Sequence, residues 1–191
     1  RAAFVTTGQR CTCTRRIVVH ESIAERFTTL LVKIASQLIV GDPNGIAGED
    51  VFMGPLVSGQ ARDGALAFQE KAANQGGRVL VASTAMDTPG GGYFITPGIM
   101  MVDRFVPAEE TAGCDIEVFG PLVRVTTAPN LDEAIAQANA TRYGLAASIF
   151  TGEDEEAHDV GGVEVVAGVA VGLAEVDAEC GGLAWVEPGG V

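Results

Sequence analysis

Long hydrophobic runs are missing from this sequence. No stretch stays apolar for the roughly 18 residues that a membrane-spanning helix needs, and the first residues lack the basic-then-apolar order of a signal peptide. Cysteine is also scarce, because the 191 residues include only four, at irregular spacing. We therefore predict reduced thiols rather than a disulfide framework, in a soluble cytoplasmic protein with no membrane partner.

Basic residues are absent after Arg142. The 12 Lys and Arg up to that point nearly balance 15 acidic residues, so most of the net charge of −13 comes from the ten acids that follow. This distribution leads us to expect no nucleic-acid partner. The sequence also lacks a Gly-x-Gly-x-x-Gly fingerprint after any predicted strand, so we expect no dinucleotide-binding domain within it.

Alternating strand and helix patterns are present in the first 150 residues. Apolar residues recur at helical spacing from Ile23 to Leu38 behind a Ser22/Glu25 capping box, and Ser58 begins a second helix that continues through Gln75. A third helix is predicted at 131–140, and strands at 16–20, 78–82, 93–96, 99–102, 122–127 and 146–150. The alternation predicts an α/β fold, a mostly parallel sheet with flanking helices, whose sites lie at the carboxyl ends of strands and in adjacent loops.

Residues 151–191 differ from the rest in composition. The stretch from Gly161 to Val191 is rich in Gly, Val, Ala and Glu, includes Cys180 and Trp185, and shows no strand–turn periodicity. We therefore predict a domain at 1–150 followed by a divergent acidic tail at 151–191. Either a shifted reading frame or a natural oligomerisation tail accounts for such an end, and the coding DNA distinguishes the two.

The strongest candidate site is the stretch Gly8-Gln9-Arg10-Cys11. A cysteine becomes a good nucleophile when nearby cations favour its thiolate, and Arg10, Arg15 and Arg16 are close in sequence. On residue chemistry alone, burial of Cys11 as a small apolar side chain is the competing interpretation. Arg15 and Arg16 either attract a carboxylate-bearing substrate or are solvated or paired within the structure.

This stretch resembles the nucleophile segment of the aldehyde dehydrogenase superfamily, in which Gly-Gln-x-Cys carries the catalytic thiol. Four further stretches match that family's catalytic domain in order and approximate spacing: Gly54-Pro55-Leu56, Thr96-Pro97, Glu117-Val-Phe-Gly-Pro121 and Asn139-Ala-Thr-Arg-Tyr-Gly-Leu145. The resemblance covers about residues 1–150. The longer forms Gly-Gln-Arg-Cys-Thr-Cys and Thr-Pro-Gly-Ile resemble the succinylglutamate-semialdehyde dehydrogenase branch, which implies a role in arginine catabolism.

The resemblance implies a reaction. The thiolate of Cys11 adds to an aldehyde, hydride leaves the resulting thiohemiacetal for NAD or NADP, and water hydrolyses the thioester to a carboxylate. The resemblance assigns the Cys11 backbone N–H to the oxyanion, Glu117 to the hydroxyls of the nicotinamide ribose, and Phe119 to packing beside that end of the cofactor. Without it, Glu117 is interpreted as a solvated loop carboxylate. The parent enzyme is expected to be a homo-oligomer.

The other thiol and imidazole groups have simpler interpretations. Cys13 is expected to line the site as a neighbour of Cys11 or to form a protective disulfide with it. Cys11, Cys13 and His20 lack the paired spacing of a zinc site, so we expect no metal. His20 and His158 are interpreted as surface or packed histidines.

Functions of different classes remain open at this stage. The first is an NAD(P)-dependent aldehyde oxidoreductase, and the second is a non-catalytic α/β module that either contributes an assembly surface or binds aldehyde or acyl groups through Cys11. A thiol esterase is a third, although nothing in the spacing places a base near Cys11. The resemblance puts the family's general-base glutamate, oxyanion asparagine and cofactor domain before Arg1. The chain is therefore expected to be a catalytic-domain fragment that does not turn over alone.

Overall fold

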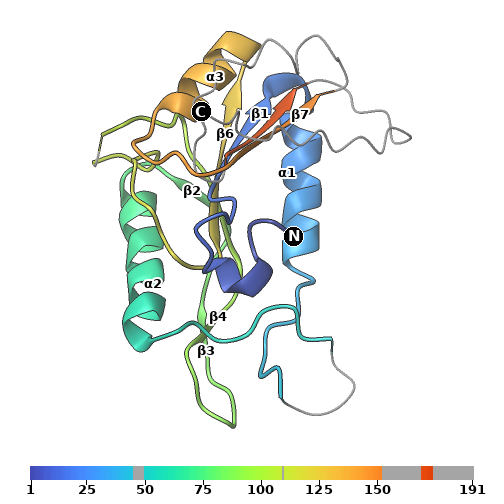
Figure 1. The fold of residues 1–191 in the computed structure, drawn as a ribbon, viewed down its shortest axis with the longest axis vertical. Coiled ribbons are helices and arrows are strands. Elements are labelled where there is room, and N and C mark those ends of the chain that lie inside the picture. Colours follow the sequence, from blue (N-terminus) through green and yellow to red (C-terminus); the bar gives the residue numbers. More distant parts are fainter. Residues whose placement is uncertain (45–49, 109, 152–168, 174–191) are drawn as a thin grey trace, which may run out of the picture.

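The computed structural model describes residues 1–44, 50–108, 110–151 and 169–173 (Figure 1). The helical elements are the short 3-10 segment η1 (Val5–Gly8) and the α-helices α1 (Glu21–Ala35), α2 (Gly59–Asn74) and α3 (Leu131–Asn139). The strands are β1 (Arg16–His20), β2 (Arg78–Val81), β3 (Ala85–Met86), β4 (Phe94–Ile95), β5 (Gly98–Met101), β6 (Leu122–Ala128), β7 (Ala147–Thr151) and β8 (Val169–Leu173).

Six strands form the central sheet, in the order β2-β5-β6-β1-β8-β7. Every neighbouring pair is parallel except β2 with β5, which is antiparallel. Strands β3 and β4 form a separate two-stranded sheet. The predicted mostly parallel α/β sheet is confirmed.

Successive side chains of each strand point to opposite faces of the sheet, so both faces carry apolar side chains. Helices cover both of these faces. Val18 of β1 faces the core that contains Phe68 of α2 and Ala134 of α3, whereas Ile17 and Val19 face the core on the α1 side. Figure 1 shows α1 on one side of the sheet and α2 on the other. The domain therefore has three layers, with a continuous apolar core on each face of the sheet.

The ends of two helices test the predicted caps. For α2 the prediction is confirmed, because the Ser58 hydroxyl accepts a hydrogen bond from the backbone N–H of Ala61. For α1 the predicted Ser22/Glu25 capping box is wrong. The helix begins at Glu21, two residues earlier than a Ser22 cap implies, and the His20 imidazole is its cap, with Nδ1 accepting from the Ser22 N–H at 3.2 Å. The other ring nitrogen of His20 lies 3.0 Å from the Pro129 carbonyl oxygen, so Nε2 carries the proton.

Strand β8 corrects the analysis of the last 41 residues, which found no strand pattern there. It lies between β1 and β7 and is parallel to both, with Val171 opposite Val18 on one side and Ile149 on the other. A central parallel strand is covered on both faces, so its sequence is a short apolar run without alternation. That is why periodicity did not reveal it. His158, Cys180 and Trp185 lie outside the described residues.

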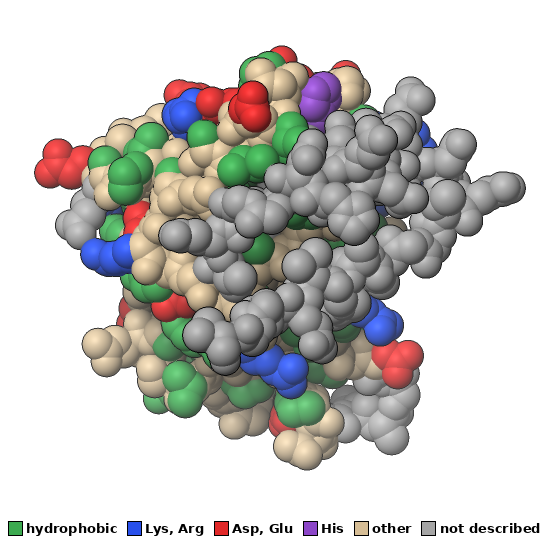
Figure 2. Space-filling model, turned by 45° about the horizontal axis from the view of Figure 1, so that its top comes forward, with side chains coloured by type: hydrophobic (Ala, Val, Ile, Leu, Met, Phe, Trp, Pro, Cys, Tyr) green, Lys and Arg blue, Asp and Glu red, His purple; other side chains and the backbone are tan. Residues whose placement is uncertain are grey.

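The surface combines all side-chain types. Figure 2 shows hydrophobic, polar and charged groups mixed over one face, with acidic groups gathered at its upper edge. Within the described ranges, no helix is both long enough and apolar enough to cross a bilayer.

Candidate active site

Cys11 lies in a loop that connects η1 to β1, and the chain enters this loop in an unusual conformation. Thr6, Thr7 and Gly8 all have left-handed backbone angles, with φ of 51°, 57° and 68°. A Cβ atom at Gly8 would lie 2.0 Å from the carbonyl oxygen of Gly120, so only glycine fits at this position. The close approach of Gly8 to Gly120 joins the start of the Cys11 loop (residues 9–14) to the segment that carries Glu117 and Phe119.

The three cysteines of the described ranges differ sharply in exposure. All three are free thiols, but Cys11 is exposed, whereas Cys13 and Cys114 are 2% and 1% exposed. The Cys13 thiol lies beneath the loop and donates to the Val5 carbonyl at 3.6 Å. The structure thus brings one accessible thiol to the loop surface, at the position that the sequence singles out.

Glu117 and Phe119 lie in the stretch just before β6, here called the cofactor segment (residues 117–120). The Phe119 ring is 43% exposed and the Glu117 side chain 23% exposed, so Glu117 is not the freely solvated carboxylate of the simpler interpretation. One oxygen of Glu117 is 3.3 Å from a guanidinium nitrogen of Arg15. The Arg15 guanidinium carbon also lies 4.4 Å from the centre of the Phe119 ring.

Arg15 connects this cofactor segment to the Cys11 loop. Its Nε donates to the Val118 carbonyl at 3.0 Å, and its terminal nitrogens donate to three carbonyls of the loop, those of Arg10, Cys11 and Cys13. Arg15 is 5% exposed. The structure therefore supports pairing within the fold, rather than contact with a substrate carboxylate, as the role of this arginine.

A third stretch, residues 54–57, is attached to the same loop. The Thr7 hydroxyl donates to the Gly54 carbonyl at 3.0 Å. The Gln9 amide donates to the Pro55 carbonyl at 3.3 Å and accepts from the Val57 N–H at 2.8 Å. Two of the sequence motifs are thus joined in the structure, since the Gln9 side chain, two residues before Cys11, bonds the stretch 54–57. Sequence analysis named Gln9 only as part of the motif, and nothing in its pattern revealed this partner.

Behind the site lie Asp115 and two further buried arginines, Arg16 and Arg124. Asp115 accepts hydrogen bonds from the Thr141 hydroxyl and, at 2.8 Å, from the Arg142 N–H, and it lies 3.8 Å from Arg16. Arg124 donates to the carbonyls of Ala112, Cys114 and Ile116. Asp115 and Arg124 therefore fix the chain that leads into the cofactor segment, and Asp115 joins it to the Asn139–Leu145 motif.

Burial disfavours the charged forms of both Arg16 and Arg124, and it lowers the pKa of each. Burial, and secondly repulsion from Arg124, lower the pKa of Arg16 to about 10, against the opposing attraction of Asp115. The group nevertheless remains protonated at neutral pH. Its second terminal nitrogen donates to the carbonyls of Gln137 and Ala140, while Nε and Nη1 have no hydrogen-bond partner in the described structure.

The position of the site in the sheet corrects one prediction. Cys11 precedes β1 and Glu117 precedes β6, so both lie at the amino ends of parallel strands, not at the carboxyl ends. The loops can meet there because β1 and β6 are adjacent and begin in register, with Arg16 opposite Arg124. These candidate residues therefore depart from the general rule for open α/β sheets, because they lie in loops that enter strands.

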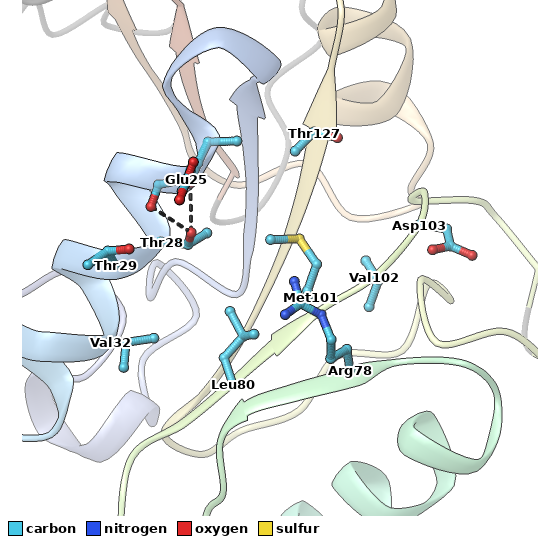
Figure 3. Close-up of a pocket in the computed structure, with 11 residues that line it drawn as sticks. Glu25, Thr28, Thr29, Val32, Arg78, Leu80, Met101, Val102, Asp103 and Thr127 are labelled. Atoms are coloured by element: carbon cyan, nitrogen blue, oxygen red, sulfur yellow. Dashed lines mark hydrogen bonds between the residues drawn. The ribbon is translucent and has the colours of Figure 1, made fainter.

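A pocket of about 750 Å³ does lie at the carboxyl ends of β5 and β6. Figure 3 shows Val32 of α1 on one side of this pocket and Leu80 and Arg78 of β2 on the other. Its lining includes neither Cys11 nor Glu117. Among the described residues, no group of three or more His, Cys, Asp or Glu is arranged to hold a metal ion.

Together these contacts define a class of protein. A three-layer α/β domain presents one exposed thiol on a loop that the buried Arg15 ties to a half-buried carboxylate and an exposed aromatic ring. The sequence model of the aldehyde dehydrogenase family matches residues 1–178. The chain therefore belongs to the aldehyde dehydrogenase family, and the match continues past Phe150, where the recognisable motifs end.

Curated relatives agree with this assignment. The chain is 38% identical over 156 residues to N-succinylglutamate 5-semialdehyde dehydrogenase 2 of Caulobacter vibrioides, covering 81% of this chain and 30% of that protein. It is 32% identical over 191 residues to the alpha-ketoglutaric semialdehyde dehydrogenase of Bacillus subtilis, covering 98% of this chain and 36% of the relative. The chain thus spans about a third of the length of these relatives.

Solved structures share the fold. The crystal structure of PnpE from Pseudomonas sp. WBC-3 superimposes with a TM-score of 0.76 at 31% identity, over 90% of this chain and 34% of that one. A structure of PnpE in complex with nicotinamide adenine dinucleotide gives the same TM-score. The glyceraldehyde-3-phosphate dehydrogenase GapN of Methanocaldococcus jannaschii, complexed with NADP, has a TM-score of 0.72 at 30% identity, over 89% of this chain and 34% of that one.

Proposed function

We propose that this chain supplies the nucleophile and part of the cofactor contact of an NAD(P)-dependent aldehyde dehydrogenase. The observation that carries the proposal is the exposure of Cys11 on a loop that Arg15 ties to Glu117 and Phe119, while Cys13 and Cys114 are buried. In the proposed reaction the Cys11 thiolate attacks the aldehyde carbon, and the carbonyl oxygen takes the negative charge. The backbone N–H of Cys11 donates to that oxyanion.

The later steps follow from the chemistry of the thiohemiacetal. NAD or NADP, when bound, accepts the hydride that leaves the former aldehyde carbon. Loss of that hydride leaves an acyl group bonded to the Cys11 sulfur as a thioester, and water then releases the carboxylate and regenerates the thiol. Covalent capture at Cys11 keeps the substrate in place through both stages.

The residues of the cofactor segment fit a nucleotide cofactor chemically. A carboxylate such as that of Glu117 accepts hydrogen bonds from vicinal hydroxyls, and its contact with Arg15 holds it in place. The exposed Phe119 ring offers a flat apolar face beside it. We therefore assign Glu117 to the ribose hydroxyls at the nicotinamide end and Phe119 to packing beside them.

For the substrate, we propose a semialdehyde that also carries a carboxylate, with N-succinylglutamate 5-semialdehyde as the first candidate. The support is the name of the Caulobacter relative together with that of the Bacillus one, both of which are semialdehyde dehydrogenases. This substrate would place the enzyme in arginine catabolism. Assembly of the whole enzyme into a homo-oligomer and the division at residue 150 stay predictions.

The test is alkylation of the 191-residue chain with iodoacetamide, followed by peptide mass spectrometry. The alkylation rate of each cysteine is divided by its own rate in about 8 M urea, which unfolds most domains. Differences in intrinsic reactivity between the cysteines then cancel. We expect Cys11 to react much faster than Cys13 and Cys114, and Cys11→Ser to abolish the fast phase. Equal normalised rates at the three cysteines would contradict the proposal.

Protection by aldehydes then addresses the substrate. N-succinylglutamate 5-semialdehyde should slow alkylation of Cys11 at lower concentration than propionaldehyde, which lacks a carboxylate, or betaine aldehyde, which is cationic. Because the chain spans about a third of the relatives' length, we expect capture of the aldehyde without turnover. Protection with no preference among the three would leave the thiol chemistry in place but reject the carboxylate-bearing substrate. Failure of all three to protect would favour a non-catalytic module.

A further inference from the structure

Three arginines are buried near the candidate site, and only one of them contacts both of its halves. Arg16 and Arg124 donate to carbonyls of residues 112–116, 137 and 140, all of which belong to the supporting structure. Arg15 instead donates to carbonyls on each side of Cys11 and to Val118 in the cofactor segment. We propose that Arg15 is a positioning residue that couples the Cys11 loop to the cofactor segment. This inference deepens the proposed function and rests on it.

The geometry of the peptide bond gives the first part of the argument. The Arg10 carbonyl, which accepts from Arg15 at 2.8 Å, shares a peptide unit with the Cys11 N–H. The described residues have no cis peptide bonds, so carbonyl and N–H point in opposite directions across that unit. Because Arg15 is buried and holds the carbonyl inward, the Cys11 N–H is directed away from Arg15. Arg15 thereby fixes the direction of the proposed oxyanion donor.

The second part concerns the Cys11 carbonyl, which accepts from Arg15 at 3.2 Å. The peptide units before and after Cys11 are thus both held by one guanidinium. With both units fixed, rotation about the backbone bonds of Cys11 is restricted, and so is the direction in which its side chain leaves the loop. A cysteine on a loop without such restraints would sample several orientations.

The third part concerns the other half of the site. The same guanidinium is 3.3 Å from a Glu117 oxygen and lies over the Phe119 ring. A planar group with five donors can make these contacts at once, whereas a lysine ammonium places its three donors at a single point. Any change in the charge or position of Glu117 therefore alters the force on Arg15, and through Arg15 it alters the Cys11 loop.

The experiment measures this coupling by hydrogen exchange and mass spectrometry on the full 191-residue chain. The variants are Arg15→Met, Arg15→Lys, Glu117→Gln, and the double variant Glu117→Gln/Arg15→Met. We expect Arg15→Met to speed exchange of the hydrogen-bonded amides of the Cys11 loop, those of Gln9, Cys13 and Thr14, by about tenfold. The reason is that loss of a charge-assisted hydrogen bond changes local opening by about that factor. Arg15→Lys should restore little of the protection.

The double variant separates positioning from general support. Glu117→Gln alone should speed exchange in the Cys11 loop, although it leaves every hydrogen bond of that loop in place. In the Arg15→Met background the same change should have no further effect on the loop. The proposal would be overturned if the two substitutions had additive effects on exchange in the Cys11 loop. It would also be overturned if Glu117→Gln did not change exchange in that loop.

Controls keep the outcomes distinct. Arg62→Met removes a guanidinium outside the site, which pairs with Asp63 and lies 5.8 Å from the Tyr93 ring, and should leave exchange in the Cys11 loop unchanged. If Arg15→Met does not fold, Glu117→Gln and Phe119→Leu, which retain Arg15, still test whether the Cys11 loop responds. If the Cys11 loop responds to Glu117→Gln but Cys11 is not alkylated rapidly, only the proposed function is rejected. If Cys11 is alkylated rapidly but the loop does not respond, only the role of Arg15 is rejected.

Discussion

At the scale of single residues, the site depends on backbone conformations that few side chains tolerate. Thr6 and Thr7 are the only non-glycine residues of the described ranges with positive φ. Left-handed geometry at a non-glycine residue costs about 1–3 kcal/mol, and it persists only where surrounding contacts enforce it. Here Thr7 is buried and its hydroxyl bonds Gly54, so the contacts that align the Cys11 loop also hold the strained residues.

Gly8→Ala tests the contact between Gly8 and Gly120. The added methyl would lie 2.0 Å from the Gly120 carbonyl oxygen, at a backbone angle that alanine disfavours. We expect a loss of about 3 kcal/mol in the free energy of unfolding, measured by urea denaturation. The control is Gly64→Ala on α2, where a Cβ atom meets nothing within 4 Å, and a gain of about 1 kcal/mol is expected. Equal effects of the two changes would refute the close approach.

Asp115→Asn tests the charge that compensates Arg16. The substitution keeps the size of the side chain but leaves the buried Arg16 next to Arg124 without its nearest carboxylate. We expect a loss of about 3 kcal/mol in the free energy of unfolding, because an uncompensated buried charge is strongly unfavourable. Asp63→Asn, which alters an exposed ion pair, should not move the denaturation midpoint measurably.

At the scale of elements, the helices begin where side chains satisfy their first N–H groups. Ser58 caps α2 and Asn130 caps α3, each through an oxygen that accepts from the N–H three residues later. His20 caps α1 through a ring nitrogen, a group that capping patterns do not include. The sequence therefore predicts the start of a helix where the cap is a frequent capping residue such as Ser or Asn, and not where it is His.

Ser58→Ala is expected to lower the free energy of unfolding by about 1 kcal/mol, because the Ala61 N–H loses its acceptor. Ser58→Asp should retain the acceptor and add a favourable charge at the helix start, so its denaturation curve should match or exceed that of the unsubstituted protein. Urea denaturation followed by circular dichroism distinguishes them. A null effect of Ser58→Ala would show that the cap is not needed.

At the scale of the whole molecule, the sheet is completed by β8, a strand from late in the sequence. β8 lies between β1, near the amino end of the sequence, and β7. It therefore forms the hydrogen bonds that connect β7 to the rest of the sheet. Pairing across such a sequence distance costs loop-closure entropy, which the contacts of β8 with both neighbours must offset. The domain is therefore expected to depend on residues 169–173 for its full stability.

Val171→Pro tests this dependence. Proline has no backbone N–H and fits poorly in a central strand, where both neighbours need ladder hydrogen bonds. We expect a loss of about 3 kcal/mol or more in the free energy of unfolding, while Val171→Thr, which keeps the N–H and the β-branch, should cost far less. If the two variants unfold at the same urea concentration, the paired position of β8 is wrong.

Prediction from sequence succeeded for features that local physics controls. Helix α2 was found at nearly its true bounds because its Ser58 cap is a local signal. Strand β6 was found because four of its seven residues, Val123, Val125, Thr126 and Thr127, are β-branched. Prediction failed for β8, whose apolar residues show no alternation, and for the start of α1, where His20 replaces the usual cap. The choice of Cys11 over the other thiols came from motif resemblance, because exposure is not visible in a linear sequence.

The sequence by itself determined the fold class and the family, because hydrophobic patterns and the order of motifs are properties of the linear sequence. Only the tertiary structure decided that the Cys11 loop and Glu117 meet at the amino ends of β1 and β6, and that Arg15 joins them. The physical reason is separation along the chain. Residues about a hundred positions apart become neighbours through strand pairing, and a side chain's partners are then set by packing that no local pattern records.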